Sequence, residues 1–351
     1  MTETETTRLS VNMNAELNSQ QPSVERSKSK VWTDRLKGSA KILFAIGIIV
    51  FMAKQGLLNF EQLKMLFEPL VFTVGLLLIG ANFFLVAWRF RILLLAENLK
   101  MSLWEANQFT LIGGFFNFAI VGGVGGDLVK GYMLAKKFPR SKMAAALCVL
   151  MDRVIGLFTM VLMAFSVMVF DFRRVWGTMQ LRAFFIFLSI VFFGFIIFLS
   201  FAFSNRLKKS PWIFWFLNRL PMSHHFISLY DSIMAYGDRK LDFLKAMSVS
   251  VLAQLSSIAL LAWAGHSLGF TEVPLTTYFI GGPLGFMAVA IPISPAGIGV
   301  GQAAFYFIFN LYIGHKSEVG PAVITAFQMF SLVVGLLGGL IYLNYKGEKK
   351  A

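Results

Sequence analysis

The chain has 351 residues, of which 57% are hydrophobic and only 14% are charged, whereas soluble proteins carry about 25% charged residues. Repeated apolar runs of nearly 20 residues can each cross a hydrocarbon core about 30 Å thick. These features exclude an ordinary soluble domain and predict an all-α, polytopic integral membrane protein. The formal net charge is +14, but the basic residues cluster between the apolar runs, where they act as topology signals. We therefore expect no nucleic-acid partner.

In chain order, the polar residues 1–34 predict a disordered cytoplasmic tail. A single transmembrane domain, 35–345, follows, with a first half (35–204), a cytoplasmic amphipathic linker (205–245) and a second half (246–345), and then a tail at 346–351. About six full spans are predicted, at Ala40–Ala53, Leu66–Trp88, Met143–Phe170, Ala183–Phe203, Ala246–Leu268 and Val319–Tyr342. Cys148, the single cysteine, falls in one of them, where a buried small hydrophobe is expected.

Two further apolar segments are interrupted by glycine and proline. The first break is Gly122-Gly123-Val124-Gly125-Gly126, followed by Asp127, and the second is Pro292-Ile293-Ser294-Pro295-Ala296-Gly297-Ile298-Gly299. A broken backbone at membrane depth persists only beside protein or a water-filled cavity, because an unpaired amide in hydrocarbon costs several kcal/mol. One break in each half is typical of transporter binding sites.

The basic residues also predict how each interrupted segment meets the membrane. They place both termini in the cytoplasm, so Leu103–Gly126 begins and ends on the cytoplasmic side and Thr271–His315 begins and ends outside. We expect two re-entrant or hairpin elements entered from opposite faces, related as inverted repeats. The alternative is two ordinary helical hairpins in which glycine and proline simply make turns.

Charged residues inside a membrane are costly and usually functional. Asp152 and Arg153 lie well inside an apolar run. Adjacent residues on a helix do not face each other, so we expect each to reach a different partner, with Asp127 or Lys130 as one of them. A structural ion-pair network and a substrate-binding role are both open.

Other polar residues predict weaker features. Arg89 and Arg91 follow Trp88 at a predicted span end, where the expectation is snorkelling to lipid phosphates and the alternative is a specific ligand role. Asn82 and Asn117 suit helix–helix hydrogen bonds or a lined cavity, and Gln302 offers a neutral amide after the second break.

The glycines allow an anion site at a helix N-terminus, or close helix packing. The first break lacks the ending of a nucleotide-binding loop, and no catalytic or metal-ligand pattern appears. We expect neither enzyme activity nor a cofactor.

Taken together, several of these motifs resemble the transmembrane region of lysylphosphatidylglycerol synthases over about residues 35–345. They are Asn117, Gly122–Gly126 with Asp127, Lys130-Gly131-Tyr132, Asp152-Arg153 and Pro292–Gly299. In the full-length synthases a cytosolic domain attaches lysine to phosphatidylglycerol, and the membrane part is linked to lipid flipping. The resemblance implies a lipid ligand, without the synthase activity. The chain departs from the family in having Gly-Gly where Pro-Gly is frequent, and an amide at Gln302 where an acid is frequent.

We therefore predict a lipid transporter or flippase-like protein of a prokaryotic inner membrane. It would bind an anionic or amphiphilic phospholipid or lipid-linked substrate between the two breaks. The candidate site residues are Asn117, Gly125, Gly126, Asp127, Lys130, Asp152, Arg153, Ser294, Pro295, Gly297, Gly299 and Gln302. The alternative is a non-catalytic membrane partner or scaffold for a lipid- or glycolipid-modifying enzyme. That enzyme and a second copy of the chain are further candidate partners.

Overall fold

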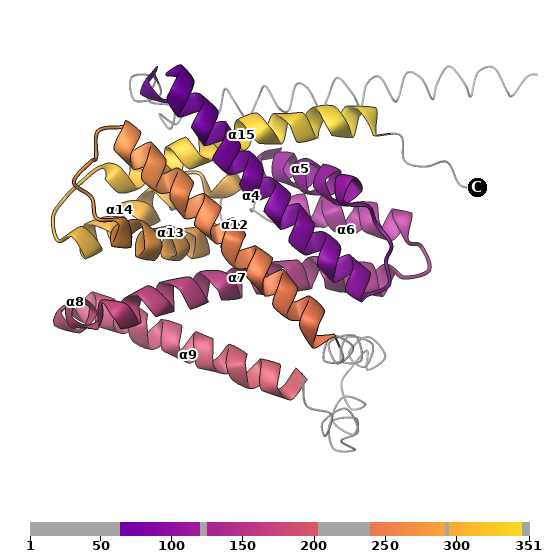
Figure 1. Ribbon diagram of the computed structural model, residues 1–351, viewed down its shortest axis with the longest axis horizontal. Coiled ribbons are helices and arrows are strands. Elements are labelled where there is room, and N and C mark those ends of the chain that lie inside the picture. The colour runs from indigo at the N-terminus through magenta and orange to yellow at the C-terminus, as the bar shows by residue number, and fades with distance from the viewer. Residues whose placement is uncertain (1–63, 120–124, 203–238, 292–294, 346–351) are drawn as a thin grey trace, which may run out of the picture. The chain divides into compact units, whose positions relative to one another are not determined.

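The computed structural model describes residues 64–119, 125–202, 239–291 and 295–345. All of them belong to one compact unit, Gln55–Ala351. Within these ranges every regular element is a helix (Figure 1), which confirms the all-α prediction. The predicted tails, the first predicted span Ala40–Ala53 and most of the predicted linker lie outside the described residues.

Five helices are long and apolar enough to cross a membrane. They are α4 (Pro69–Ala96), α7 (Lys142–Phe170), α9 (Met179–Ala202), α12 (Lys240–Ser267) and α15 (Val319–Asn344). Each coincides with a predicted span. Two of them run further than expected: α4 continues past Trp88 to Ala96, and α12 already begins at Lys240.

The two interrupted segments fold as pairs of short helices. The first pair is α5 (Leu103–Ala119) with α6 (Gly125–Lys137), and the second is α13 (Leu275–Val289) with α14 (Val300–Ile313). None of the four reaches the roughly 20 residues that a full crossing needs, and the two helices of each pair pack together. Each break therefore produces a hairpin of half-length helices, as predicted.

Backbone geometry explains why the chain turns at the second break. Ala296 and Gly297, inside the short 3₁₀ turn η1 (Pro295–Gly297), have φ angles of 48° and 69°, and Gly299 just after it has a φ angle of 84°. This left-handed region suits glycine and costs an L-residue about 1–2 kcal/mol. The helix cannot continue through it, so α14 starts afresh at Val300. Its first turn is capped by the Gln302 side chain, whose Oε1 accepts the Gly299 N–H at 2.7 Å.

The helices form two sets in the same order: α4, α5, α6 and α7, then α12, α13, α14 and α15. In this order α4 corresponds to α12, α5 to α13, α6 to α14 and α7 to α15. The contacts follow the same correspondence: α5 packs on α15, α13 packs on α7, and the first helices of the two sets, α4 and α12, pack along each other. The α4–α12 pair is antiparallel. Trp263 Nε1 donates to the Val71 carbonyl at 3.4 Å, while Arg89 donates to Ser250 at 2.8 Å. An antiparallel central pair with exchanged contacts is the arrangement of inverted repeats.

Two helices stand outside this repeat. The short α8 (Phe172–Gly177) connects α7 to α9, and α9 packs along α7. Little of α9 is buried, so most of its apolar surface is available to lipid.

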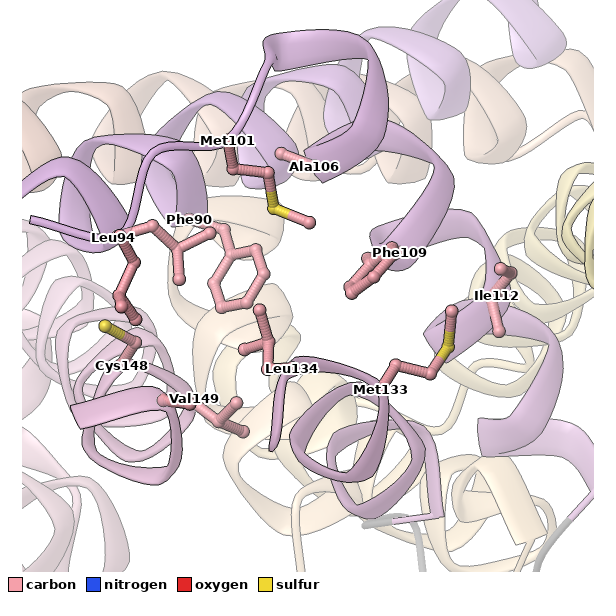
Figure 2. Close-up of a cluster of buried hydrophobic side chains, with 12 residues drawn as sticks. Phe90, Leu94, Met101, Ala106, Phe109, Ile112, Met133, Leu134, Cys148 and Val149 are labelled. Carbon is pink, nitrogen blue, oxygen red and sulfur yellow. The ribbon is translucent and has the colours of Figure 1, made fainter. Parts of the chain in front are cut away.

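A cluster of buried side chains holds the first hairpin in place. It joins Phe90 of α4, Phe109 of α5, Leu134 of α6 and Cys148 of α7 (Figure 2). Because lipid is as apolar as these side chains, their contribution comes from close packing. The Cys148 thiol is buried and donates to the Leu93 carbonyl at 3.6 Å, which agrees with its predicted structural role. Close packing here determines where α6, and with it Lys130, lies against α4 and α7.

Candidate functional site

Asp152, midway along α7, is the centre of a buried ion network. Its side chain is 7% exposed; Oδ1 accepts a hydrogen bond from Arg89 Nε at 2.7 Å, and Oδ2 lies 3.4 Å from Lys130 Nζ. Each carboxylate oxygen therefore has its own cation, one from α4 and one from α6. Removing one partner of such a buried group costs about 3–5 kcal/mol, so Asp152 ties three helices together.

The position of Arg89 corrects the prediction that it snorkels to lipid phosphates. Because α4 continues to Ala96, Arg89 lies well inside the helix and is buried. Besides Asp152 it donates through Nη1 to Ser250 Oγ, at 2.8 Å. Gly156 of α7 leaves room for it, since a Cβ there would lie 3.2 Å from Nη1. Two of its five N–H donors are thus used within the described part of the chain.

Lys130 is buried too, on the inner face of α6. Its Nζ lies 4.2 Å from the centroid of the Phe90 ring, a cation–π contact, as well as near Asp152. Gly113 of α5 makes this possible, because a Cβ at that position would lie 2.9 Å from Lys130 Cδ.

Arg153, the neighbour of Asp152, points to a different partner, as predicted. Its Nε pairs with Asp127 Oδ2 near the start of α6, and both side chains are partly exposed. Both predicted partners are therefore used: Lys130 by Asp152, and Asp127 by Arg153.

The first hairpin is closed by a backbone contact. The Gly126 N–H donates to Asn117 Oδ1 at 2.9 Å, and a Cβ on Gly126 would lie 2.1 Å from the Gly113 carbonyl oxygen. Gly125 and Gly126 are buried at this junction. Here glycine serves close packing, one of the two roles that the sequence left open, and the Gly126 amide is used by Asn117.

At the second break the polar groups are uncharged. Gln302 Nε2 donates to Gln328 Oε1 at 2.8 Å and to Thr325 Oγ1 at 3.2 Å. Gln328 Nε2 in turn donates to the Ala296 carbonyl at 3.1 Å. An amide chain thus joins α14, α15 and the turn. Pro295, Gly297 and Gly299 shape this turn, while Ser294 lies outside the described residues.

Residues of both hairpins line one cavity of about 340 Å³. Five of the predicted site residues line it, and Ala296 lines it from the second break. The other described candidates, Gly125, Gly126, Pro295, Gly297, Gly299 and Gln302, are not part of the lining. The polar residues that line it, among those the structure describes, are Asn82, Arg89, Thr110, Asn117, Asp127, Lys130, Asp152, Arg153, Gln254, Ser257, Gln328 and Ser331.

Arg89 was noted in the sequence but not placed among the site residues, and the polar lining residues Thr110, Gln254, Ser257, Gln328 and Ser331 were missed. Gln254 and Gln328 lie inside apolar spans, and an isolated amide in such a span was a usable signal, as it was for Asn82. Asn82 donates from Nδ2 to the Ala253 carbonyl and to Ser257 Oγ, both at 2.8 Å, so it joins α4 to α12 and also lines the cavity.

Among the described residues that line the cavity, positive charges outnumber negative ones. Arg89, Lys130 and Arg153 stand against two carboxylates, Asp127 and Asp152, which leaves one formal positive charge in this part of the lining. No cluster of three or more metal-ligating side chains occurs in the described ranges. The arrangement is therefore suited to binding an anion, and arginine is well adapted to phosphate because its planar group donates two parallel hydrogen bonds.

The helices and the cavity define a polytopic helical membrane protein with a polar, net cationic cavity between two broken hairpins. The model of the family described as the lysylphosphatidylglycerol synthase TM region matches residues 39–339. The chain belongs to this family, as the motifs of the two breaks indicated. No curated protein and no solved structure matched the chain.

Proposed function

We propose that this protein binds the anionic head group of a membrane lipid in the cavity and moves it between the two leaflets. The observation that carries the proposal is the excess of one cation among the described lining residues of a cavity to which both hairpins contribute. The family is named for the membrane region of a lipid-modifying synthase, which supports a lipid ligand.

The size and lining of the cavity favour a head group over a whole lipid. At about 340 Å³ the cavity is at the lower end of the range for small-ligand sites, about 300–1,000 Å³. A phosphodiester fits such a space while its acyl tails stay in the bilayer. Crossing hydrocarbon unaided would cost the phosphate several kcal/mol or more, and the surplus cation offsets that cost.

The repeat supports a transport cycle. Rocking of the two four-helix sets about the antiparallel α4–α12 pair would expose the cavity alternately to each side. No nucleotide-binding loop is present in the sequence. We therefore propose downhill or ion-coupled movement, with Asp127 and Asp152 as the candidate proton carriers, and no catalytic activity.

Reconstitution tests this function directly. In liposomes with tail-labelled fluorescent phosphatidylglycerol, the protein should speed exchange between leaflets. Exchange is measured as the rate at which inner-leaflet fluorescence loses its protection from a membrane-impermeant reductant. Arg89→Gln removes the surplus charge and should slow exchange about tenfold or more. Arg89→Lys, which keeps the charge but loses the planar group, should retain part of the rate.

Arg91→Gln is the matched control. Arg91 is two residues further along α4, donates to the Met101 carbonyl and is not part of the lining, so its substitution should leave exchange unchanged. Exchange equal to that of protein-free liposomes, for the wild type and Arg89→Gln alike, would refute transport. A role as membrane partner for a lipid-modifying enzyme would then be the better proposal.

A further inference from the structure

The two hairpins place polar pairs at equivalent positions. Asp127 is the third residue of α6 and pairs with Arg153, 26 residues later in α7. Gln302 is the third residue of α14 and pairs with Gln328, 26 residues later in α15. The ion pair of the first helix set and the amide pair of the second set therefore occupy equivalent positions.

The amide pair has unused hydrogen-bonding capacity. A glutamine side chain has two N–H donors and an oxygen with two lone pairs. In Gln328, one donor is used by the Ala296 carbonyl and one lone pair by Gln302. Within the described residues, one donor and one acceptor remain, on a side chain that is buried and lines the cavity.

That combination matches a hydroxyl group, which both donates and accepts. An ammonium group is a poor match, because it only donates and would add to a surplus positive charge. The other polar lining residues that α12 and α15 contribute, Gln254, Ser257 and Ser331, are also uncharged. This part of the lining thus offers hydrogen bonds without charge.

We propose that Gln328 forms a second subsite, which takes the uncharged, hydroxyl-bearing end of the lipid head group. Arg89, Lys130 and Arg153 hold the phosphate of the same head group. Gln302 is a positioning residue, since it acts through Gln328. This inference rests on the proposed function and narrows it: the preferred substrates are monoanionic phosphodiester lipids carrying a polyol or a sugar, and lipids whose head group ends in an amine are disfavoured.

Exchange of three tail-labelled lipids tests the subsite: phosphatidylglycerol and phosphatidylinositol, which carry polyols, and phosphatidylethanolamine, which carries an amine. The wild type should exchange the first two about tenfold faster than the third, the effect of two hydrogen bonds. Gln328→Met has a similar volume and should abolish the preference while exchange continues. Gln302→Met should weaken the preference, a change that a merely structural role would not produce.

A second variant covers the case in which Gln328→Met does not fold. Gln328→Glu keeps the shape and neutralises the cavity, so the preference should shift toward phosphatidylethanolamine. Gln108→Met on α5, outside the lining, is the control and should behave as the wild type.

The outcomes separate the two proposals. Equal exchange of all three lipids by the wild type would overturn the subsite and leave transport standing. Exchange of no lipid would overturn both. An unchanged preference in folded Gln328→Met and Gln328→Glu would also overturn the subsite.

Discussion

In the first hairpin Asp127 meets Arg153, whereas in the second Gln302 meets Gln328 at the equivalent place. Both pairs join a half-length helix to the long helix that follows it. The fold therefore requires a polar contact at this junction, but the contact need not be charged. In the first half the described lining carries one cation more than carboxylates, and this excess supports the anionic ligand that we propose.

The largest expected effect is a difference in the side of the membrane on which each of the two hairpins begins. In a Cys148→Ser background, Trp104→Cys and Leu275→Cys place thiols near the start of α5 and α13, where the native side chains are 65% and 58% exposed. A membrane-impermeant maleimide should label the first only from the cytoplasmic side and the second only from outside. Labelling of both from one face would refute the opposed orientation. Cys148→Ser alone should remain unlabelled.

The next effect compares the stability of the two polar networks. Asp152→Ala leaves Arg89 and Lys130 buried without their carboxylate and should lower the free energy of unfolding by about 3–5 kcal/mol. Gln328→Ala removes only neutral hydrogen bonds and should cost about 1–3 kcal/mol. Unfolding in detergent, followed by circular dichroism, measures both. If the Gln328 variant lost as much stability as the Asp152 variant, the charged network would not contribute more to the free energy of unfolding than the amide network.

The smallest effect is a pH dependence confined to the first hairpin. Partial burial of Glu105, in the first turn of α5, opposes its ionisation, but Lys137 and Ser102 outweigh this and hold its pKa below the usual value. The stabilisation is therefore fully present above the unfolded pKa, about 4.3, and is lost as the pH falls through the lower folded value.

Glu105→Gln tests this dependence in the ion pair with Lys137. The variant should be slightly less stable than the wild type at pH 7 and equally stable once the pH is below the folded pKa. The melting temperature, measured as a function of pH in detergent, reports the difference. A constant difference across the whole range would contradict the assignment.

Much of the site could be predicted from the sequence. Asp152 and Arg153 were evident because charge inside an apolar run is costly and needs a partner. The two breaks were evident because glycine and proline stop helices. Arg89 was misplaced because the predicted span ended at Trp88, whereas α4 continues to Ala96; the apolar residues after Arg91 were the overlooked sign.

The sequence by itself determined the membrane class, five of the described spans, the two half-length hairpins and the presence of charge within the bilayer. These depend on local hydrophobicity and on backbone preferences, which act over a few residues. Only the tertiary structure decided that Arg89 of α4 reaches Asp152 of α7 and that Gln328 completes the same cavity. Those contacts arise where helices distant in the sequence pack together, and the spacing of residues within one helix gives its buried face but not the neighbour it meets.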